Sequence, residues 1–328
     1  MSEPDVSIVI AAYNSAATIP RAVAGALAQD FDGTVEVVVV DDGSTDDTRV
    51  AAERAGARVV SQPNAGPAAA RNRGFREARA DVILFTDSDC VPHADWARLL
   101  TAGLDEDVHV VGGSYGIANP GRYLAELVHA EIRWRHSRLP DLVEFAGSFN
   151  LGARRAALEA VGGFDESFPA PSGEDNDLSY RLRDAGFAIR FVRDALVDHH
   201  HPEKLSRYLR EQSRHGYWRM YLYAAHPGRM RGDGYAGPLD FATPPLAALS
   251  VAFLVAAPFV PTTVAYALFT FALVVALSEI LAMQVARFTR SASALGLAPV
   301  ATLRAYARGW GLVRGLLAGL ARVRRGAR

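Results

Sequence analysis

Two aspartates one residue apart are the clearest candidates for chemistry in this sequence. Residues 82–89 read Val-Ile-Leu-Phe-Thr-Asp-Ser-Asp, a short apolar run that ends in Asp87 and Asp89. A buried strand of this kind delivers its last residues to the edge of a sheet, and side chains two positions apart on an extended chain point the same way. Two carboxylates aimed at one point suit Mg²⁺ or Mn²⁺, with a bound diphosphate supplying further oxygens. The alternative is two surface acids after a strand.

Polar or aromatic residues also follow two earlier apolar runs. Ala11 and Tyr13 stand at the end of the run 6–12, where a dinucleotide-binding fold would carry a glycine-rich turn, so a dehydrogenase is disfavoured. The Tyr13 ring can stack on a nucleobase, and Asp42, after the run 35–40, can accept a hydrogen bond from a base or a ribose hydroxyl. Each alone is an ordinary loop residue. Together with the Asp-x-Asp pair they predict a crevice along which base, ribose and metal-bound diphosphate follow one another.

A later acidic pair, Glu174 and Asp175, follows the loop 169–173. A carboxylate close to a sugar acceptor can take the proton of its hydroxyl as a general base, while a metal ion stabilises the departing diphosphate. We therefore predict that Asp175 is the base of a sugar transfer. The alternative is that both acids only cap the helix that begins there.

Three single residues are further candidates. His199, the first of three consecutive histidines, is a candidate third metal ligand or phosphate contact. Zinc is poorly supported, because no cysteine or histidine pair elsewhere completes a zinc site. Arg71, in the predicted helix before the metal strand, either contacts phosphate or faces solvent. Trp218, on a predicted helix with Tyr217, packs against acceptor or lipid headgroups, or simply belongs to the core.

These residues need a sheet to bring them together, and the early part of the chain predicts one. Apolar, β-rich runs alternate there with segments of helical spacing. The pattern predicts an α/β fold with a doubly wound, mostly parallel sheet, and it excludes all-β and helix-bundle folds. The predicted strands are 6–12, 35–40, 58–61 and 82–86, and the predicted helices are 19–29, 47–55 and 68–78. The less regular middle has predicted strands at 108–114 and 189–192 and predicted helices at 121–138, 154–161 and 173–184.

Charge is unevenly distributed over the 328 residues. Residues 1–238 hold 34 acidic and 26 basic residues, whereas residues 239–328 hold 2 acidic and 9 basic ones. Nucleic acid is therefore an unexpected partner, because the acidic front part lacks the positive field that such binding needs. Cys90 is the single cysteine, so no intrachain disulfide forms, and we expect it to be a small buried side chain. The first residues lack the basic start and long apolar run of a signal peptide.

The composition changes near residue 239. Residues 244–286 carry one charge, Glu279, and Pro258 and Pro261 mark a turn near the middle of this stretch. Its length matches about two bilayer crossings of ~20 residues each. We therefore predict a transmembrane helical hairpin over residues 239–286. Glu279 would lie near the interface, paired with another helix or functional.

The tail is basic. Residues 287–328 hold nine arginines and no acid, which predicts a cytoplasmic position by the positive-inside tendency. Two crossings return the N-terminal domain to the same side. Residues 298–323 mix apolar side chains with spaced arginines, which predicts an amphipathic helix held in the membrane interface by anionic lipids. A solvated basic tail is the alternative.

The sequence resembles the family 2 glycosyltransferases with the GT-A fold over roughly residues 5–225. The motifs that carry the resemblance occur in family order. They are Val6-Ser-Ile-Val-Ile-Ala-Ala-Tyr-Asn14, Val40-Asp-Asp-Gly-Ser-Thr-Asp46, Asn64-Ala-Gly-Pro67, Ala70-Arg-Asn-Arg-Gly74, Thr86-Asp-Ser-Asp89, Gly147-Ser-Phe-Asn150, Val161-Gly-Gly-Phe-Asp-Glu166 and Gly173-Glu-Asp-Asn-Asp-Leu178.

The resemblance implies roles for single residues. Tyr13 would stack on the base, Asp42 would bind it, and Arg71 would approach the diphosphate. The full expectation is donor binding by Ala11, Tyr13, Asp42, Arg71 and Asp87, metal binding by Asp87, Asp89 and His199, a catalytic base at Asp175, and acceptor contacts by Asn150, Glu174 and Trp218.

The expected protein is an inverting transferase on the cytoplasmic face of the plasma or inner membrane that depends on Mg²⁺ or Mn²⁺. It would move one sugar from a nucleotide-diphosphate sugar, most commonly a UDP-sugar in this family, to a lipid-linked or glycan acceptor. The C-terminal region resembles exopolysaccharide transferases of the succinoglycan type. Gln212 is followed by Ser213-Arg214-His215, which departs from the Gln-x-x-Arg-Trp signature of processive cellulose and hyaluronan synthases, so transfer of a single sugar is favoured.

The expected domains are a transferase domain, a hairpin and a tail. Their bounds are 1–238, with a donor half 1–104 and an acceptor half 105–238, then 239–286 and 287–328. Two other functions are weighed. A nucleotidyltransferase would need a glycine-rich, lysine-bearing loop after the first strand, which is absent, and a membrane scaffold would bind nucleotide-sugar without chemistry.

Overall fold

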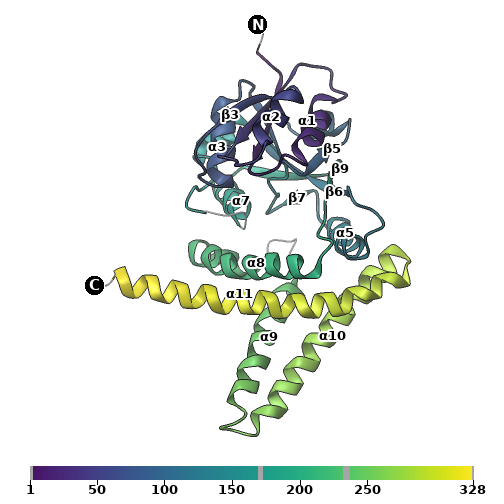
Figure 1. Ribbon diagram of the computed structural model, residues 1–328, viewed down its shortest axis with the longest axis vertical. Coiled ribbons are helices and arrows are strands. Elements are labelled where there is room, and N and C mark those ends of the chain that lie inside the picture. Colours follow the sequence, from purple (N-terminus) through teal and green to yellow (C-terminus); the bar gives the residue numbers. More distant parts are fainter. Residues whose placement is uncertain (1–2, 169–172, 232–236, 327–328) are drawn as a thin grey trace. The chain divides into compact units, whose positions relative to one another are not determined.

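Parallel strands alternate with helices in the first part of the computed structural model, which describes residues 3–168, 173–231 and 237–326 (Figure 1). The strands are β1 (Val6–Ala12), β2 (Val35–Asp41), β3 (Arg58–Ser61) and β4 (Val82–Asp87), and the helices between them are α1 (Ile19–Leu27), α2 (Thr48–Arg54) and α3 (Pro67–Glu77). The four strands pair in parallel, in the order β3-β2-β1-β4. The predicted α/β fold with a doubly wound sheet is therefore confirmed.

Both faces of this sheet are covered, which is why its strands are apolar at nearly every position. Ile8 and Ile10 of β1 are fully buried in one core cluster with Ile19 of α1. Val9 points the other way, and Gly74 of α3 lies so close to it that a side chain at position 74 would collide with Val9. The alternation along one strand thus places α1 and α3 on opposite faces.

The later strands make the sheet mixed. They are β5 (Cys90–Pro92), β6 (Val108–Ile117), β7 (Leu142–Val143), β8 (Asn150–Arg154) and β9 (Ala188–His199). The described residues form one nine-stranded sheet, in which β8 runs antiparallel to β4 and β6, and β5 and β7 run antiparallel to β9. The helices of this part are α4 (Trp96–Ala102), α5 (Tyr123–His136), α6 (Arg155–Ala160) and α7 (Glu174–Asp184). β5 and β7 are too short to show a periodic pattern, so the sequence did not predict them.

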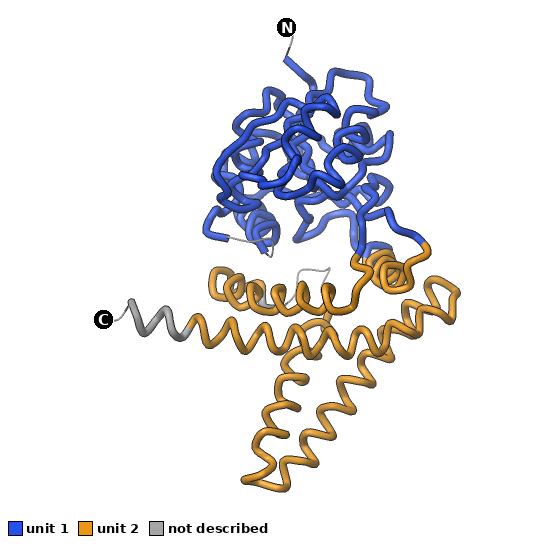
Figure 2. The backbone as a smooth tube through the Cα atoms, in the orientation of Figure 1, with its two compact units in different colours: residues 1–120, 136–201 blue, residues 121–135, 202–328 orange. Residues whose placement is uncertain are grey.

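The chain forms two compact units (Figure 2). Unit 1 comprises residues 1–120 and 136–201, and unit 2 comprises residues 121–135 and 202–328. These bounds differ from the expected domain boundary at residue 238. The expected boundary followed composition, whereas α5 and α8 (Leu205–Ala225) group by packing with the C-terminal helices.

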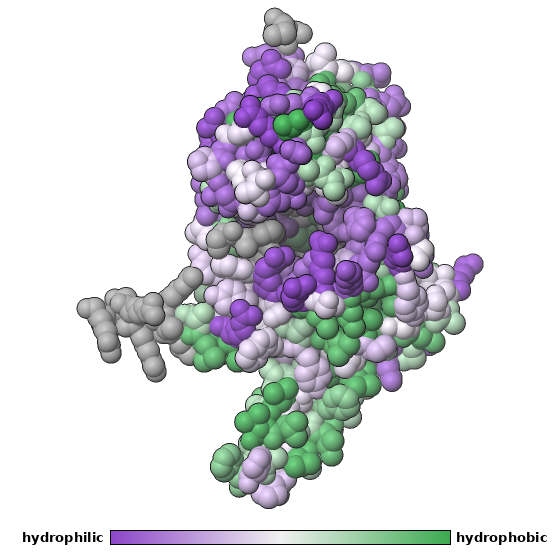
Figure 3. Space-filling view, in the orientation of Figure 1, coloured by the Kyte–Doolittle hydropathy of each residue, from purple (hydrophilic) through white to green (hydrophobic). Residues whose placement is uncertain are grey.

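Unit 2 consists of helices. Besides α5 and α8 they are α9 (Pro238–Ala256), α10 (Thr263–Thr289) and α11 (Leu297–Gly326). α9 and α10 match the predicted hairpin, and both are long and apolar enough to cross a membrane. Their apolar side chains face outward, with Val255 of α9 68% and Phe269 of α10 67% exposed. Figure 3 shows the hydrophobic colour gathered along this hairpin. A core helix of a water-soluble domain would bury these side chains instead.

Buried charges link four helices of unit 2. Glu131 of α5 accepts hydrogen bonds from Arg135 and from Arg304 of α11, each at 2.6 Å. Arg135 also donates to Asp240 of α9 at 2.6 Å, and Arg308 of α11 donates to Gln212 of α8. The two arginines that face Glu131 outweigh the effect of its burial and lower its pKa to about 2. Since each charge is paired, the cluster is tolerated inside the helical packing.

Candidate functional site

The carboxyl ends of the first parallel strands bring several predicted site residues to one edge of the sheet. Ala11 of β1 pairs with Val40 of β2 on one side and with Asp87 of β4 on the other. Tyr13 follows β1 directly, and Asp42 follows β2. Tyr13 is 51% exposed, so its ring has a free face for stacking. The register therefore places the ends of β2, β1 and β4 next to one another at this edge.

Asp42 is held in its position by the turn that leads into α3. Its carboxylate accepts hydrogen bonds from the Gln62 side chain at 2.7 Å and from the backbone N–H groups of Ala65 and Gly66 at 2.9 Å. The residue is 3% exposed. Three of about four lone-pair positions are therefore used within the protein, and the main visible effect of Asp42 is to fix the turn at 62–66.

Arg71 of α3 joins two acidic segments. It donates to Asp87 at the end of β4 and to Glu174 at the start of α7, both at 2.9 Å. The Arg71 side chain is 6% exposed, and the two carboxylates raise its pKa despite burial. The expected contact of Arg71 with the diphosphate stays a prediction. The Arg71 charge is used to bridge Asp87 and Glu174, which places the start of α7 beside the end of β4.

Asp175 follows Glu174 on the first turn of α7 and is half-buried. Burial, followed by the negative charge of Glu174, raises its pKa to about 7, while Arg71 acts in the opposite direction. Its Oδ2 lies against Gly147, where an added Cβ would be 3.7 Å away. A carboxylate with a pKa close to neutral is suited to exchange a proton at physiological pH.

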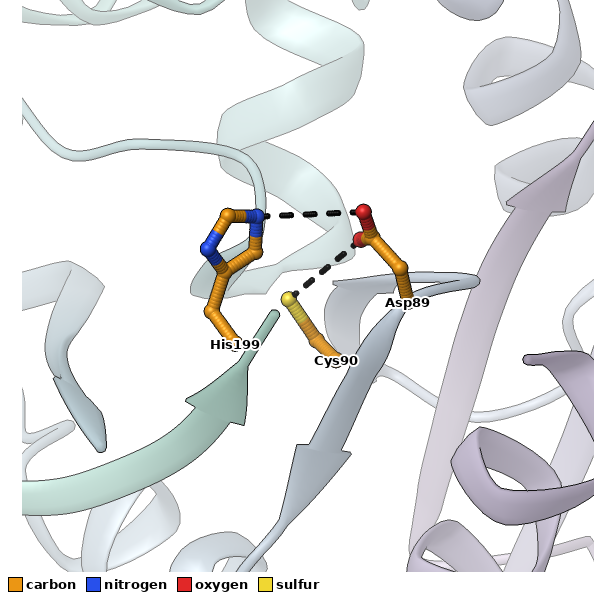
Figure 4. A group of neighbouring side chains, drawn as sticks. All are labelled: Asp89, Cys90 and His199. Atoms are coloured by element: carbon orange, nitrogen blue, oxygen red, sulfur yellow. Dashed lines mark hydrogen bonds and ion pairs between the residues drawn. The ribbon is translucent and has the colours of Figure 1, made fainter. Parts of the chain in front are cut away.

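Asp89 and His199 meet across the strand pair β5–β9, in which His199 lies opposite Cys90 (Figure 4). His199 Nε2 is 3.8 Å from Asp89 Oδ2, and the Cys90 thiol donates to Asp89 Oδ1 at 3.8 Å. Two ligand atoms that each lie about 2.1 Å from one cation are separated by up to about 4.2 Å, so the Asp89–His199 pair can share an ion. Burial raises the pKa of the Cys90 thiol well above its usual value, so Cys90 stays a protonated, weak ligand.

The expected convergence of Asp87 with Asp89 on one point is only partly met. Asp87 is the last residue of β4 and is paired with Arg71, whereas Asp89 lies in the following turn and faces His199. The alternation of an extended strand ends at Asp87, so the two carboxylates have different neighbours. Among the described residues, Asp89, Cys90 and His199 offer ligand atoms that lie close enough together for one metal ion. Through Arg71, Asp87 is joined to α3 and α7.

Two predicted acceptor residues have other surroundings. Asn150 is fully buried, donates to the carbonyls of Ser114 and Ala195 at 2.9 Å, and accepts from Trp96 Nε1 at 2.8 Å. The polar atoms of Asn150 are thus satisfied inside the sheet, and its contact with the acceptor stays a prediction. Trp218 lies in unit 2, on α8, where its ring packs against Tyr217 and Tyr221.

Sequence reasoning missed the surroundings of His199. His199 Nδ1 is 3.1 Å from His201 Nδ1, and the Tyr115 ring lies 5.2 Å from the His199 ring and 5.8 Å from that of His201. The signal was present, since His201 stands two residues after His199. A shallow cavity of about 430 Å³ also opens between α3 and α7, lined among others by Asn72 and Arg181, but it includes none of the predicted site residues.

Comparisons with known proteins agree with this architecture. Residues 7–163 match the family model described as glycosyl transferase family 2. The chain is 32% identical over 246 residues to a pre-mycofactocin glycosyltransferase of Mycobacterium tuberculosis, covering 70% of this chain and 49% of that protein. It is 40% identical over 171 residues to the succinoglycan biosynthesis protein ExoO of Rhizobium meliloti, covering 48% of each. The chain thus spans about half the length of these relatives.

A solved structure shares the fold. The mannosyltransferase PcManGT from Pyrobaculum calidifontis superposes with a TM-score of 0.59 at 21% sequence identity, over 96% of this chain and 88% of that one. The parallel sheet and the sequence match agree: residues 7–163 of this chain form a glycosyl transferase family 2 domain.

Proposed function

We propose that this protein transfers one sugar from a nucleoside diphosphate sugar to a lipid-linked or glycan acceptor, with inversion at the anomeric carbon. The observation that carries the proposal is the Arg71 bridge. By pairing with Asp87 and Glu174 at 2.9 Å each, Arg71 keeps the proposed base, Asp175, next to the strand end that precedes Asp89. Donor-binding and proton-accepting groups thereby belong to one site within unit 1.

The chemistry divides among these residues. Asp175, as a carboxylate, takes the proton of the acceptor hydroxyl while the acceptor oxygen bonds to the anomeric carbon. The bond from that carbon to the diphosphate oxygen breaks, and the electron pair leaves with the nucleoside diphosphate. A single displacement of this kind inverts the anomeric centre. A base with a pKa of about 7 is half ionised at neutral pH, close to the optimum for general base catalysis.

A divalent cation fits the pair formed by Asp89 and His199. A carboxylate oxygen together with an imidazole nitrogen suits Mn²⁺, and two ligands from the protein leave positions for diphosphate oxygens. When bound, such an ion would neutralise charge on the departing diphosphate. PcManGT is described in complex with GDP-Man and Mn²⁺, which supports the same donor chemistry here. Tyr13 and Asp42 would meet the nucleoside.

The acceptor is proposed to be lipid-linked because of unit 2. The outward-facing apolar helices α9 and α10 suit insertion as a hairpin into the plasma or inner membrane, and the arginines of the tail favour a cytoplasmic position for unit 1 and α11. α11 presents Trp310 and Leu317, each 61% exposed, as an interfacial helix would. Trp218 on α8 is proposed to contact the acceptor or lipid headgroups. Insertion raises the local concentration of a lipid acceptor.

A donor panel tests the proposal. Full-length protein with Mn²⁺ and membrane lipid extract is offered UDP-, GDP- and dTDP-sugars, and the lipids are analysed by mass spectrometry. We expect one class of donor to add a single sugar mass with release of the nucleoside diphosphate. Donor binding without either transfer or hydrolysis across the whole panel would instead favour a non-catalytic scaffold.

A further inference from the structure

His201 is a buried histidine that the proposed reaction does not use. It is 1% exposed and stands two residues after His199. Its backbone is fixed from both sides by one side chain, because Asn119 accepts from the His201 N–H at 3.0 Å and donates to the His201 carbonyl at 2.9 Å. The Asn119 amide thus continues the pairing of β6 with β9 beyond the last strand residue, and it holds His201 in one position.

The His201 ring is directed at His199. The two Nδ1 atoms are 3.1 Å apart, a hydrogen-bonding distance at which one nitrogen carries the proton and the other offers a lone pair. Tyr115 contacts both rings and stacks on Phe149 with 3.6 Å between ring centres. The packing therefore leaves the two imidazoles little freedom to rotate.

The direction of this hydrogen bond decides whether His199 Nε2 faces Asp89 with a proton or with a lone pair. If His201 were the donor, the proton of neutral His199 would sit on Nε2 and would be expected to hydrogen-bond Asp89. The Nε2–Oδ2 distance of 3.8 Å is too long for that bond. If His199 is the donor, Nε2 carries a lone pair that faces Asp89, which is the form that binds a metal ion.

We propose that His201 is a positioning residue for the metal site: its Nδ1 accepts the proton of His199 Nδ1 and so keeps the His199 Nε2 lone pair directed at the ion shared with Asp89. The inference rests on the proposed metal role of Asp89 and His199. It follows the general rule that a metal-binding histidine donates its second ring N–H to a partner that fixes its orientation. Here the partner is a second histidine held by Asn119.

Two nearly isosteric substitutions test the role. His201→Asn keeps an acceptor close to the position of Nδ1, whereas His201→Leu places a methyl group there. We expect Mn²⁺ affinity of the full-length protein, measured from the EPR signal of free Mn²⁺ with UDP or GDP present, to fall about 10- to 100-fold in His201→Leu and less than about threefold in His201→Asn. Equal affinities in the two variants would overturn the proposal, whether both are high or both are low.

Two further measurements separate this proposal from the proposed function. Asp89→Asn should abolish Mn²⁺ binding, and if it does not, the metal site itself is wrong. If Asp89→Asn fails to bind while His201→Leu binds normally, the site stands and the positioning role falls. Should His201→Leu fail to fold, ¹⁵N NMR of histidine-labelled, metal-free wild-type protein decides. A proton on Nδ1 of His199 supports the proposal, and a proton on its Nε2 overturns it.

Discussion

The adjacent acids Glu174 and Asp175 should respond to neutralisation with opposite signs. Asp175 has a pKa of about 7 in the folded protein, against an ordinary value of 3.8 for an aspartate side chain. Between these pH values the folded chain holds a proton that the unfolded chain has lost, so the stability of the wild type falls as pH rises through this window. Asparagine does not ionise, so Asp175→Asn removes this fall in stability. The substitution should therefore stabilise the protein above pH 7 and change its stability little below pH 4.

The size of the effect follows from the shift. One pKa unit corresponds to about 1.4 kcal/mol, so a shift of this size amounts to about 4 kcal/mol. Water that reaches the half-buried Asp175 side chain reduces this penalty, and we expect Asp175→Asn to be more stable by about 2–4 kcal/mol at pH 8. That corresponds to a melting temperature higher by about 4–8 °C in a protein of this size. Turnover should fall by about 10²–10⁴-fold.

Glu174→Gln provides the matched control. It removes one of the two carboxylates that neutralise the buried Arg71, and loss of a buried partner costs about 3–5 kcal/mol. Melting curves at pH 5 and pH 8 for the three proteins, together with turnover from pH 5.5 to 8.5, test both residues. Wild-type turnover should rise with pH and level off above about 7. If Asp175→Asn melts at the same temperature difference from wild type at both pH values, the burial argument is refuted, and if it keeps normal turnover, the base role is refuted.

Three further substitutions have defined outcomes. Asp89→Ala should reduce Mn²⁺-dependent turnover by at least about 100-fold without lowering the melting temperature, and normal turnover would exclude Asp89 as a ligand. Asn150→Leu should lower the free energy of unfolding by about 2–4 kcal/mol, because it leaves Trp96 Nε1 and two carbonyls unpaired. An unchanged melting curve would show that the hydrogen bonds of Asn150 do not stabilise the fold. Glu131→Gln should destabilise unit 2 by about 3–5 kcal/mol, since Arg304 loses its charged partner, and a melting temperature equal to that of wild type would show that the pair is dispensable.

The local sequence pattern was enough to predict the strands whose ends carry the proposed donor-binding residues. β1, β2 and β4 are apolar runs that end in polar residues, and parallel pairing then aligns their ends. Asp89 follows a strand and His199 ends one, and their side chains lie 3.8 Å apart, while their binding of a metal ion stays a prediction. The helical hairpin could be predicted from composition alone, because a long stretch with almost no charge is recognisable without knowledge of the residues that it contacts.

Contacts between segments that are distant in the sequence could not be predicted from it. Arg71 pairs with Asp87 and Glu174, which lie 16 and 103 positions away in the sequence. Nothing in the local sequence shows that Arg71 forms these two ion pairs. The surroundings of Asn150 are a second example. β8 starts at Asn150, and the residue is buried in the sheet, where groups of Trp96, Ser114 and Ala195 form hydrogen bonds with its side chain.

The assignment of α5 to the helical unit has a practical consequence for dissecting this chain. The backbone passes between the units after residues 120, 135 and 201, so no single cut yields unit 1 by itself. A protein shortened to residues 1–238 would keep Glu131 and Arg135 but lose their second partners, Arg304 and Asp240. Truncation at the compositional boundary would therefore leave Glu131 and Arg135 paired only with each other and would uncover the face of α8 that packs on α11. Such a fragment should aggregate or misfold even though its sheet is complete.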